Sequence, residues 1–328
     1  MSNSNSQKPL IVILGSTASG KTGWAMKLCQ RFSGEIVSAD SRQIYREMNI
    51  GTAKSPQAQI SNFKFQISKT DNEIKQHLID IVDPDESFTL SDYKELAIKK
   101  INDIHDRGKI PFLVGGTGLY ISSVVDNLDI PEVAPDKKLR AELERKNTKD
   151  LRKELKILDP VFYEKIDLNN RRRLIRAIEV CKITGNPFSS LRKKGKPLFN
   201  VLQIGIDIPR EELNKKIDKR VDEMREAGLE EEVRNLSKKY SWDLLSMSGI
   251  GYQEFRDHLD CYVACYVTID DVFEEIKKHT RQYAKKQMTW FRRDKSVQWT
   301  GDFKKAELLV LNALTPNPSP YSYNKFGG

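Results

Sequence analysis

The residues with the clearest chemistry are the eight at positions 15–22, which read GSTASGKT. They match the G-x-x-x-x-G-K-[ST] pattern of a phosphate-binding loop, or P-loop. In such a loop the glycines let backbone N–H groups converge on phosphate oxygens, and the following helix N-terminus adds positive potential. Lys21 supplies a positive charge and the Thr22 hydroxyl can hold Mg2+. The sequence therefore predicts that a diphosphate or triphosphate binds Gly15, Ser16, Thr17, Ala18, Ser19, Gly20, Lys21 and Thr22.

Three apolar runs are expected to position this loop and two further polar residues. Residues 10–14 precede the P-loop, and a helix-like stretch, 23–32, follows it. A second run ends at Asp40, and a third, 110–114, leads through two glycines to Thr117. Because ligands lie beyond the carboxyl ends of the strands in an open parallel sheet, the P-loop, Asp40 and Thr117 should meet in one crevice. A carboxylate beside a bound diphosphate suits accepting a proton from an incoming nucleophile.

Seven segments together resemble the ordered motifs of the tRNA dimethylallyltransferase family. They are GSTASGKT, IVSADSRQIYREMNIGTAK, HLIDIVDPDESFTLSDY, PFLVGGTGLY, NNRRRLIRAIEV, SGIGYQE and TRQYAKKQMTWFRR, and they cover about residues 10 to 300. Ser16 departs from the family, which commonly has proline there; this loosens the loop without removing a phosphate contact.

The resemblance implies transfer of a dimethylallyl group from dimethylallyl diphosphate to N6 of the adenosine 3′ of the tRNA anticodon. Lys21, with Mg2+ on Thr22, would hold the diphosphate and stabilise its charge as it leaves. Asp40 would take the proton from the N6 amine, and Thr117 would fix that amine or a diphosphate oxygen. The adenosine must be unstacked to reach the crevice. ATP could compete for the same loop.

Basic residues gather near the C-terminus, where 277–295 holds eight of them against one acid, Asp294. Tyr283, Trp290 and Phe291 are interleaved and either stack on bases or face the core. A second cluster, 171–176, opens a predicted helix whose buried stripe is Leu174, Ile178 and Cys181. The residues predicted to contact the anticodon stem-loop are Asp40, Ser41, Arg42, Gln43, Thr117, Arg140, Arg172, Arg173, Arg176, Arg281, Gln282, Lys285, Lys286 and Arg292.

Asp80 and Asp83 follow His77 and are either extra acids of the crevice or loop caps. The four histidines are scattered, so they form no ligand set. The four cysteines form no C-x-x-C pair, and Cys261 and Cys265 are treated as small hydrophobic residues rather than metal ligands.

The alternation of strand and helix predicts an α/β fold, with a P-loop parallel-sheet core, helices on both faces and a helical insertion domain. The helix 89–107 begins with a capping box of Thr89 and Asp92. Residues 201–208 form a return strand, and 211–239 and 270–292 are long helices. The predicted parts are a disordered N-terminus, 1–9, the core, 10–130 and 200–312, the insertion, 131–199, and a disordered tail, 313–328.

The composition of the 328 residues fits a water-soluble protein with a formal charge of +9, which permits binding of nucleic acid. No apolar run approaches a membrane span and the N-terminus lacks a signal-peptide pattern, so we expect a cytoplasmic protein without membrane contact. Separately, we expect a monomer. Three rivals remain: a P-loop nucleotide kinase, an adenylate prenyltransferase and a non-catalytic RNA-binding module. The glycine-rich end of the third run and the basic C-terminal half disfavour the kinase, and Asp40 disfavours the binding module.

Overall fold

The computed structural model describes residues 7–54, 74–131, 133, 136–191, 193–259 and 267–315. Cys261 and Cys265 lie outside the described residues, as do 1–6 and 316–328 of the two predicted disordered termini. Within the described residues, Pro9 and residues 313–314 belong to a strand and a helix rather than to the predicted termini. The first strand begins at Pro9, and the last helix continues to Leu314, because it packs on the sheet through Ala306 and Val310.

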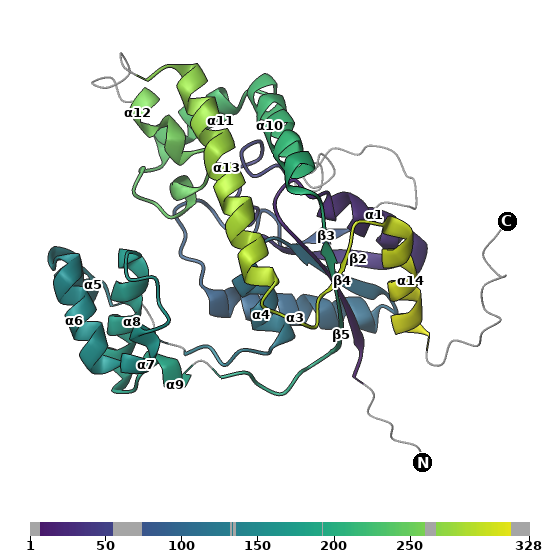
Figure 1. Ribbon diagram of the computed structural model, residues 1–328, viewed down its shortest axis with the longest axis horizontal. Helices are drawn as coiled ribbons and strands as arrows, with labels where there is room; N and C mark the ends of the chain where they lie inside the picture. Colours follow the sequence, from purple (N-terminus) through teal and green to yellow (C-terminus); the bar gives the residue numbers. More distant parts are fainter. Residues whose placement is uncertain are drawn as a thin grey trace. The chain divides into compact units, whose positions relative to one another are not determined.

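A six-stranded parallel sheet forms the centre of the fold (Figure 1), in the order β3-β2-β4-β1-β5-β6. The predicted strands are confirmed, whereas β3 and β6 were not predicted because such short segments show no periodicity. The strands are β1 Pro9–Leu14, β2 Gly34–Ala39, β3 Gln76–His77, β4 Ile110–Gly115, β5 Asn200–Ile206 and β6 Gln298–Thr300.

Successive side chains of a strand point to opposite faces of the sheet, so both faces present apolar side chains. Helices cover both of these faces. On one face, Ile11 and Ile13 pack with α1 (Lys21–Phe32) and α14 (Phe303–Leu314). On the other, α3 (Leu90–Asp106) starts with the predicted capping box, and the buried Tyr93 hydroxyl donates to the Ser38 carbonyl of β2 at 3.0 Å. The predicted α/β fold with helices on both faces is confirmed.

Five more α-helices lie outside residues 126–197, and two of them, α10 and α13, carry residues of the site described below. The five are α4 (Gly118–Val125), α10 (Arg210–Glu226), α11 (Leu229–Lys239), α12 (Arg256–Leu259) and α13 (Ile269–Phe291). The prediction of one helix over 211–239 is wrong. Gly228 has a φ of +91°, and the turn lets Leu229 and Val233 pack with Val221 of α10.

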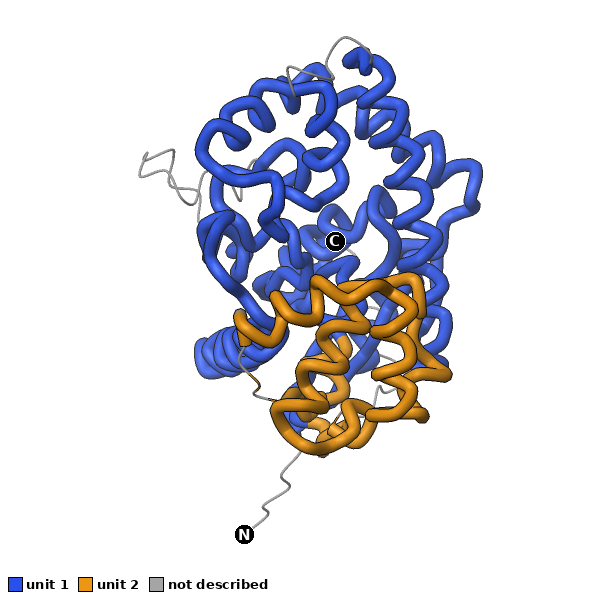
Figure 2. The backbone as a smooth tube through the Cα atoms, turned by 90° about the vertical axis from the view of Figure 1, so that its left-hand side faces the viewer, with its two compact units in different colours: residues 1–121, 198–328 blue, residues 122–197 orange. Residues whose placement is uncertain are grey.

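Two compact units divide the chain (Figure 2): residues 1–121 with 198–328, and residues 122–197. The second unit is helical, and its buried residues include Leu151, Leu174, Ile178 and Cys181. It begins at Ser122 rather than at 131, because the break falls within α4. Its other helices are α5 Lys137–Arg145, α6 Thr148–Leu158, α7 Pro160–Tyr163, α8 Arg171–Thr184 and α9 Phe188–Leu191. Among the described residues, no helix is long and apolar enough to cross a membrane.

Candidate active site

Three adjacent strands end at the same level, and each is followed by predicted site residues. Gly115 of β4 is paired with Leu14 of β1 on one side and with Ala39 of β2 on the other. A Cβ at Gly115 would collide with the Ala39 carbonyl oxygen, so this close approach requires glycine. The P-loop, Asp40 and Thr117 therefore start from one edge of the sheet, as the sequence predicted.

The P-loop leaves the first turn of α1 open to an anion. The helix is capped by Gly20 in a left-handed conformation, with no side-chain cap and no acidic residue in the first turn. Within the loop the Lys21 ammonium donates to the Ser16 carbonyl. The Ser19 hydroxyl is buried and has no hydrogen-bond partner among the described residues. An unpaired buried hydroxyl is costly, so a phosphate oxygen is a suitable partner for it.

Two cations and one carboxylate determine the electrostatics beside the loop. Burial lowers the pKa of Lys21 to about 8; the nearby Asp40 opposes this shift, and Arg220 of α10 adds to it. Burial also lowers the Arg220 pKa, again opposed by Asp40. The Arg220 guanidinium donates to the Thr17 hydroxyl at 3.3 Å. Two desolvated positive groups thus face the loop, an arrangement that favours an anionic ligand.

Asp40 and Thr117 are held by short local hydrogen bonds. One Asp40 oxygen, Oδ1, accepts from the Arg42 backbone N–H at 2.9 Å, and Oδ2 has no partner among the described residues. Thr117 Oγ1 accepts from the Ser41 backbone N–H at 3.0 Å and donates to the Ser41 hydroxyl at 3.3 Å. Asp40 thus has a fixed orientation and one oxygen available to accept a proton.

Arg42 and Gln43, which were also predicted to contact tRNA, donate hydrogen bonds to the protein's own backbone. Arg42 Nη1 donates to the Leu245 carbonyl at 2.6 Å, and Gln43 Nε2 donates to the Thr52 carbonyl at 3.2 Å. Both side chains therefore shape the loop after β2, which limits what they can offer a ligand.

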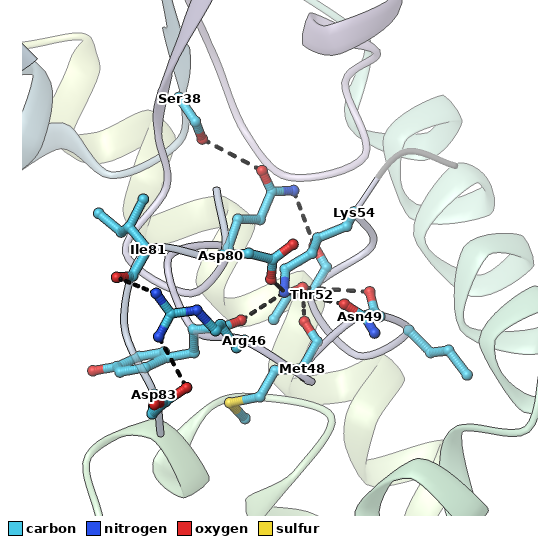
Figure 3. Close-up of polar contacts among 12 residues, drawn as sticks. Ser38, Arg46, Met48, Asn49, Thr52, Lys54, Asp80, Ile81 and Asp83 are labelled. Carbon is cyan, nitrogen blue, oxygen red and sulfur yellow. Dashed lines mark hydrogen bonds and ion pairs between the residues drawn. The ribbon is translucent and has the colours of Figure 1, made fainter. Parts of the chain in front are cut away.

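Asp80 and Asp83 form ion pairs with residues of the loop after β2 (Figure 3). Asp80 forms a buried ion pair with Lys54, whose ammonium also donates to the Tyr45 carbonyl at 2.6 Å. Burial lowers the Lys54 pKa, and the Asp80 carboxylate opposes that shift. Asp83 pairs with Arg46 at 3.0 Å. These partners favour the loop role over that of an extra crevice acid.

One face of α13 lies over the loop that contains Thr117. Gln287 contacts Gly116, and the Trp290 ring lies where a Cβ of Gly118 would be. Burial together with Asp40 raises the Tyr283 pKa to about 12, and Thr117 and Gln287 oppose this shift. The aromatic residues divide between the two alternatives: Phe291 is in the core, whereas Tyr283 and Trp290 are each 38% exposed.

The basic residues of α13 and of its C-cap, Arg292, differ in their partners. Arg281 forms an ion pair with Asp218 of α10, and Arg292 pairs with Asp207 at 3.0 Å. Lys277 and Lys278 also pair with acidic side chains. Gln282, Lys285 and Lys286 are exposed, and neither lysine has an ion-pair partner in the described part of the chain.

In the helical unit, the buried Glu179 holds two of the predicted tRNA contacts. It accepts from Arg140 at 2.8 Å and from Arg176 at 2.7 Å, and these partners hold its pKa below the usual range despite burial. Arg172 and Arg173 at the start of α8 are exposed. The two exposed residues are thus the better placed to meet an external anion.

Arg220 and Gln287 were missed by the sequence analysis. Arg220 falls on the helical stripe of Leu213 and Ile217, and Gln287 falls between the buried Ala284 and Phe291. A polar residue on an apolar helix stripe was the available signal for both.

Comparison with known proteins shows where this site belongs. The family model described as IPP transferase matches residues 43–294. The chain belongs to this family. A tRNA dimethylallyltransferase of Roseiflexus sp. (strain RS-1) is 44% identical over 290 residues, which cover 87% of this chain and 90% of the relative. That of Acetivibrio thermocellus is 42% identical over 313 residues, covering 92% and 95%.

Solved structures of related sequence have the same fold. The tRNA isopentenylpyrophosphate transferase of Bacillus halodurans matches with a TM-score of 0.65 and 37% identity, covering 93% of this chain and 95% of that one. A eukaryotic dimethylallyltransferase described as acting on tRNA matches with a TM-score of 0.72 and 27% identity, covering 93% and 77%. The matched range, 43–294, includes Thr117, Arg220 and Gln287.

Proposed function

We propose that the protein transfers a dimethylallyl group from dimethylallyl diphosphate to N6 of the adenosine 3′ of the anticodon in tRNA. The observation that carries this proposal is the common edge shared by the P-loop, Asp40 and Thr117. This edge offers a cradle for a diphosphate beside a carboxylate that can accept a proton. The names of the relatives support the same activity.

The diphosphate half of the site consists of residues 15–22, which include Lys21, together with Arg220. The backbone of the loop and the open first turn of α1 suit phosphate oxygens. The charges of Lys21 and Arg220 stabilise the negative charge that develops as the C1–O bond breaks. The diphosphate departs with the electron pair of that bond.

The acceptor half consists of Asp40 and Thr117. As the adenine N6 nitrogen forms its bond to C1 of the dimethylallyl group, Asp40 Oδ2 takes the proton that the amine loses. Thr117 orients the segment that carries Asp40 through its bonds to Ser41.

Mg2+ suits the diphosphate half, and Thr22 with the substrate oxygens would hold it. The described residues contain no group of three or more His, Cys, Asp or Glu side chains that could bind a metal alone. Mg2+ commonly takes one or two protein ligands and completes its shell with phosphate oxygens and water, so a lone hydroxyl fits. When bound, it would supply charge neutralisation of the diphosphate.

The anticodon stem-loop is expected to bind exposed basic residues, chiefly Lys285 and Lys286 of α13 and Arg172 and Arg173 of α8. The predicted contacts that pair with acids within the protein, among them Arg281, would contribute less. A monomer in the cytoplasm, where tRNA is found, completes the proposal.

A single incubation separates the proposed transferase from its rivals. With dimethylallyl diphosphate and Mg2+, an unmodified anticodon stem-loop should gain about 68 Da, the mass of C5H8, on the one base that enters the site. Parallel reactions offer AMP as acceptor, and ATP with adenosine. Prenyl transfer to AMP in preference to RNA would favour the adenylate prenyltransferase. Phosphate transfer from ATP, without a mass gain on RNA, would overturn the transferase in favour of the kinase.

Replacing Lys285 and Lys286 together by Ala should weaken tRNA binding at all tRNA sequences. If each contacts one phosphate, the slope of log K against log salt should fall by roughly 0.7 to 0.9 per contact. Binding is measured by fluorescence anisotropy across a salt series. The adjacent exposed lysines of α14, Lys304 and Lys305, give a control with the same loss of charge. If the two double variants have equal slopes of log K against log salt, Lys285 and Lys286 of α13 do not contact tRNA.

A further inference from the structure

Gln287 of α13 connects two loops of the site with a single side chain. It is 7% exposed and lies between the P-loop and the loop after β4. Its Oε1 accepts from the Thr17 backbone N–H at 2.8 Å, and its Nε2 donates to the Gly116 carbonyl at 2.8 Å. Both ends of the carboxamide are therefore engaged, each with a different strand end.

Each of the two loops carries one half of the proposed reaction. Thr17 belongs to the diphosphate cradle, and its hydroxyl accepts from Arg220. Gly116 immediately precedes Thr117, which holds Ser41 beside Asp40. The Gln287 side chain leaves no room for a Cβ at Gly116, so the carboxamide and this backbone lie in direct contact.

We propose that Gln287 is a positioning residue that fixes the distance between the diphosphate cradle and the Asp40–Thr117 pair. This inference rests on the proposed prenyl transfer, in which an amine must meet C1 in line with the departing diphosphate. A displacement of about 1 Å in such a reaction can cost about 10^2 in rate.

Gln287→Met removes both hydrogen bonds but keeps the length of the side chain. We expect kcat to fall by about 10^2, as for a misplaced reactant. The affinity for pyrophosphate, measured by calorimetry, should change by less than about threefold, because the loop keeps Lys21 and Arg220. A split of this kind between kcat and binding distinguishes positioning from loss of the cradle.

Gln287→Glu tests the contact with Gly116 separately. An ionised carboxylate can accept from Thr17 but cannot donate to the Gly116 carbonyl, whereas a protonated carboxyl can do both. The ratio of variant kcat to parent kcat should therefore rise as the pH is lowered. Asp40 is present in both proteins, so its own titration cancels in this ratio.

Gln203 gives a matched control for the cost of losing a buried glutamine. It is 6% exposed in β5 and donates to Asp294 and Ser296, both at 2.8 Å. Gln203→Met should lower the melting temperature about as much as Gln287→Met while leaving kcat within about threefold of the parent.

The proposal is overturned if Gln287→Met keeps kcat within about threefold of the parent, or if Gln203→Met loses as much. If Gln287→Met does not fold, the pH ratio of Gln287→Glu decides, and a flat ratio overturns the proposal. A parent protein that transfers no prenyl group to RNA would instead contradict the proposed function.

Discussion

Asp40→Asn is expected to lower single-turnover prenyl transfer by roughly 10^2 to 10^4, the usual contribution of a general base. The amide can still accept from the Arg42 N–H, so the local turn remains, but it cannot take a proton from the N6 amine. Pyrophosphate should bind at least as tightly as in the parent, because the substitution removes a negative charge beside Lys21. The measurements are rapid-quench kinetics and calorimetry.

Asp83→Asn is the matched control, since Asp83 is a half-buried acid that pairs with Arg46. The rate of single-turnover prenyl transfer of Asp83→Asn should equal that of the parent. If Asp40→Asn itself stays within about threefold of the parent, Asp40 is not the base. Asp80 is a poor substitute in that case, because its carboxylate is buried against Lys54.

The strand ends were predictable because the rule that links them is general. The runs 10–14, 35–40 and 110–114 predict strands, and in a parallel sheet their carboxyl ends must share an edge. The break at Gly228 was harder to foresee, since an isolated glycine within a helical pattern is compatible with one helix or two. The packing of Leu229 and Val233 against the core decides between them.

The contacts between helices and loops could not be predicted from the sequence. Arg281 and Lys285 are both basic residues of α13, yet Arg281 meets Asp218 of α10 and Lys285 meets no acid among the described residues. That difference depends on how α10 and α13 pack, which periodicity does not report. The partners of Gln287 could not be predicted for the same reason, since they lie 270 and 171 residues away in the chain.

Lys21→Met should lower the activity of the protein but raise its stability in the absence of ligand. Activity should fall by roughly 10^2 to 10^3 in kcat/KM, as on loss of a donor to a developing charge. Lys21 faces the phosphates before and during the reaction, so pyrophosphate affinity should fall as well. Binding of tRNA alone should change little. Loss of tRNA affinity with normal affinity for pyrophosphate would contradict the assignment of Lys21 to the diphosphate.

The same variant should be more stable than the parent when no ligand is present. Burial lowers the pKa of Lys21 from 10.5 to about 8, so at pH 7 the folded protein carries a desolvated charge. At about 1.4 kcal/mol per pKa unit this lowering costs roughly 3.5 kcal/mol, which exceeds the roughly 1.5 to 3 kcal/mol contributed by the lost hydrogen bond from the charged ammonium to Ser16.

The sign of the pH dependence follows from proton binding. Below about pH 8 Lys21 is protonated in both the folded and unfolded states, so the cost is fully present. Between about pH 8 and 10.5 the unfolded state binds more protons, and the parent gains stability relative to Lys21→Met. Bound pyrophosphate should reverse the order at pH 7, because it pairs with the charge. Melting temperatures at pH 7 and pH 10, with and without pyrophosphate, test this, and a variant less stable than the ligand-free parent at pH 7 would contradict it.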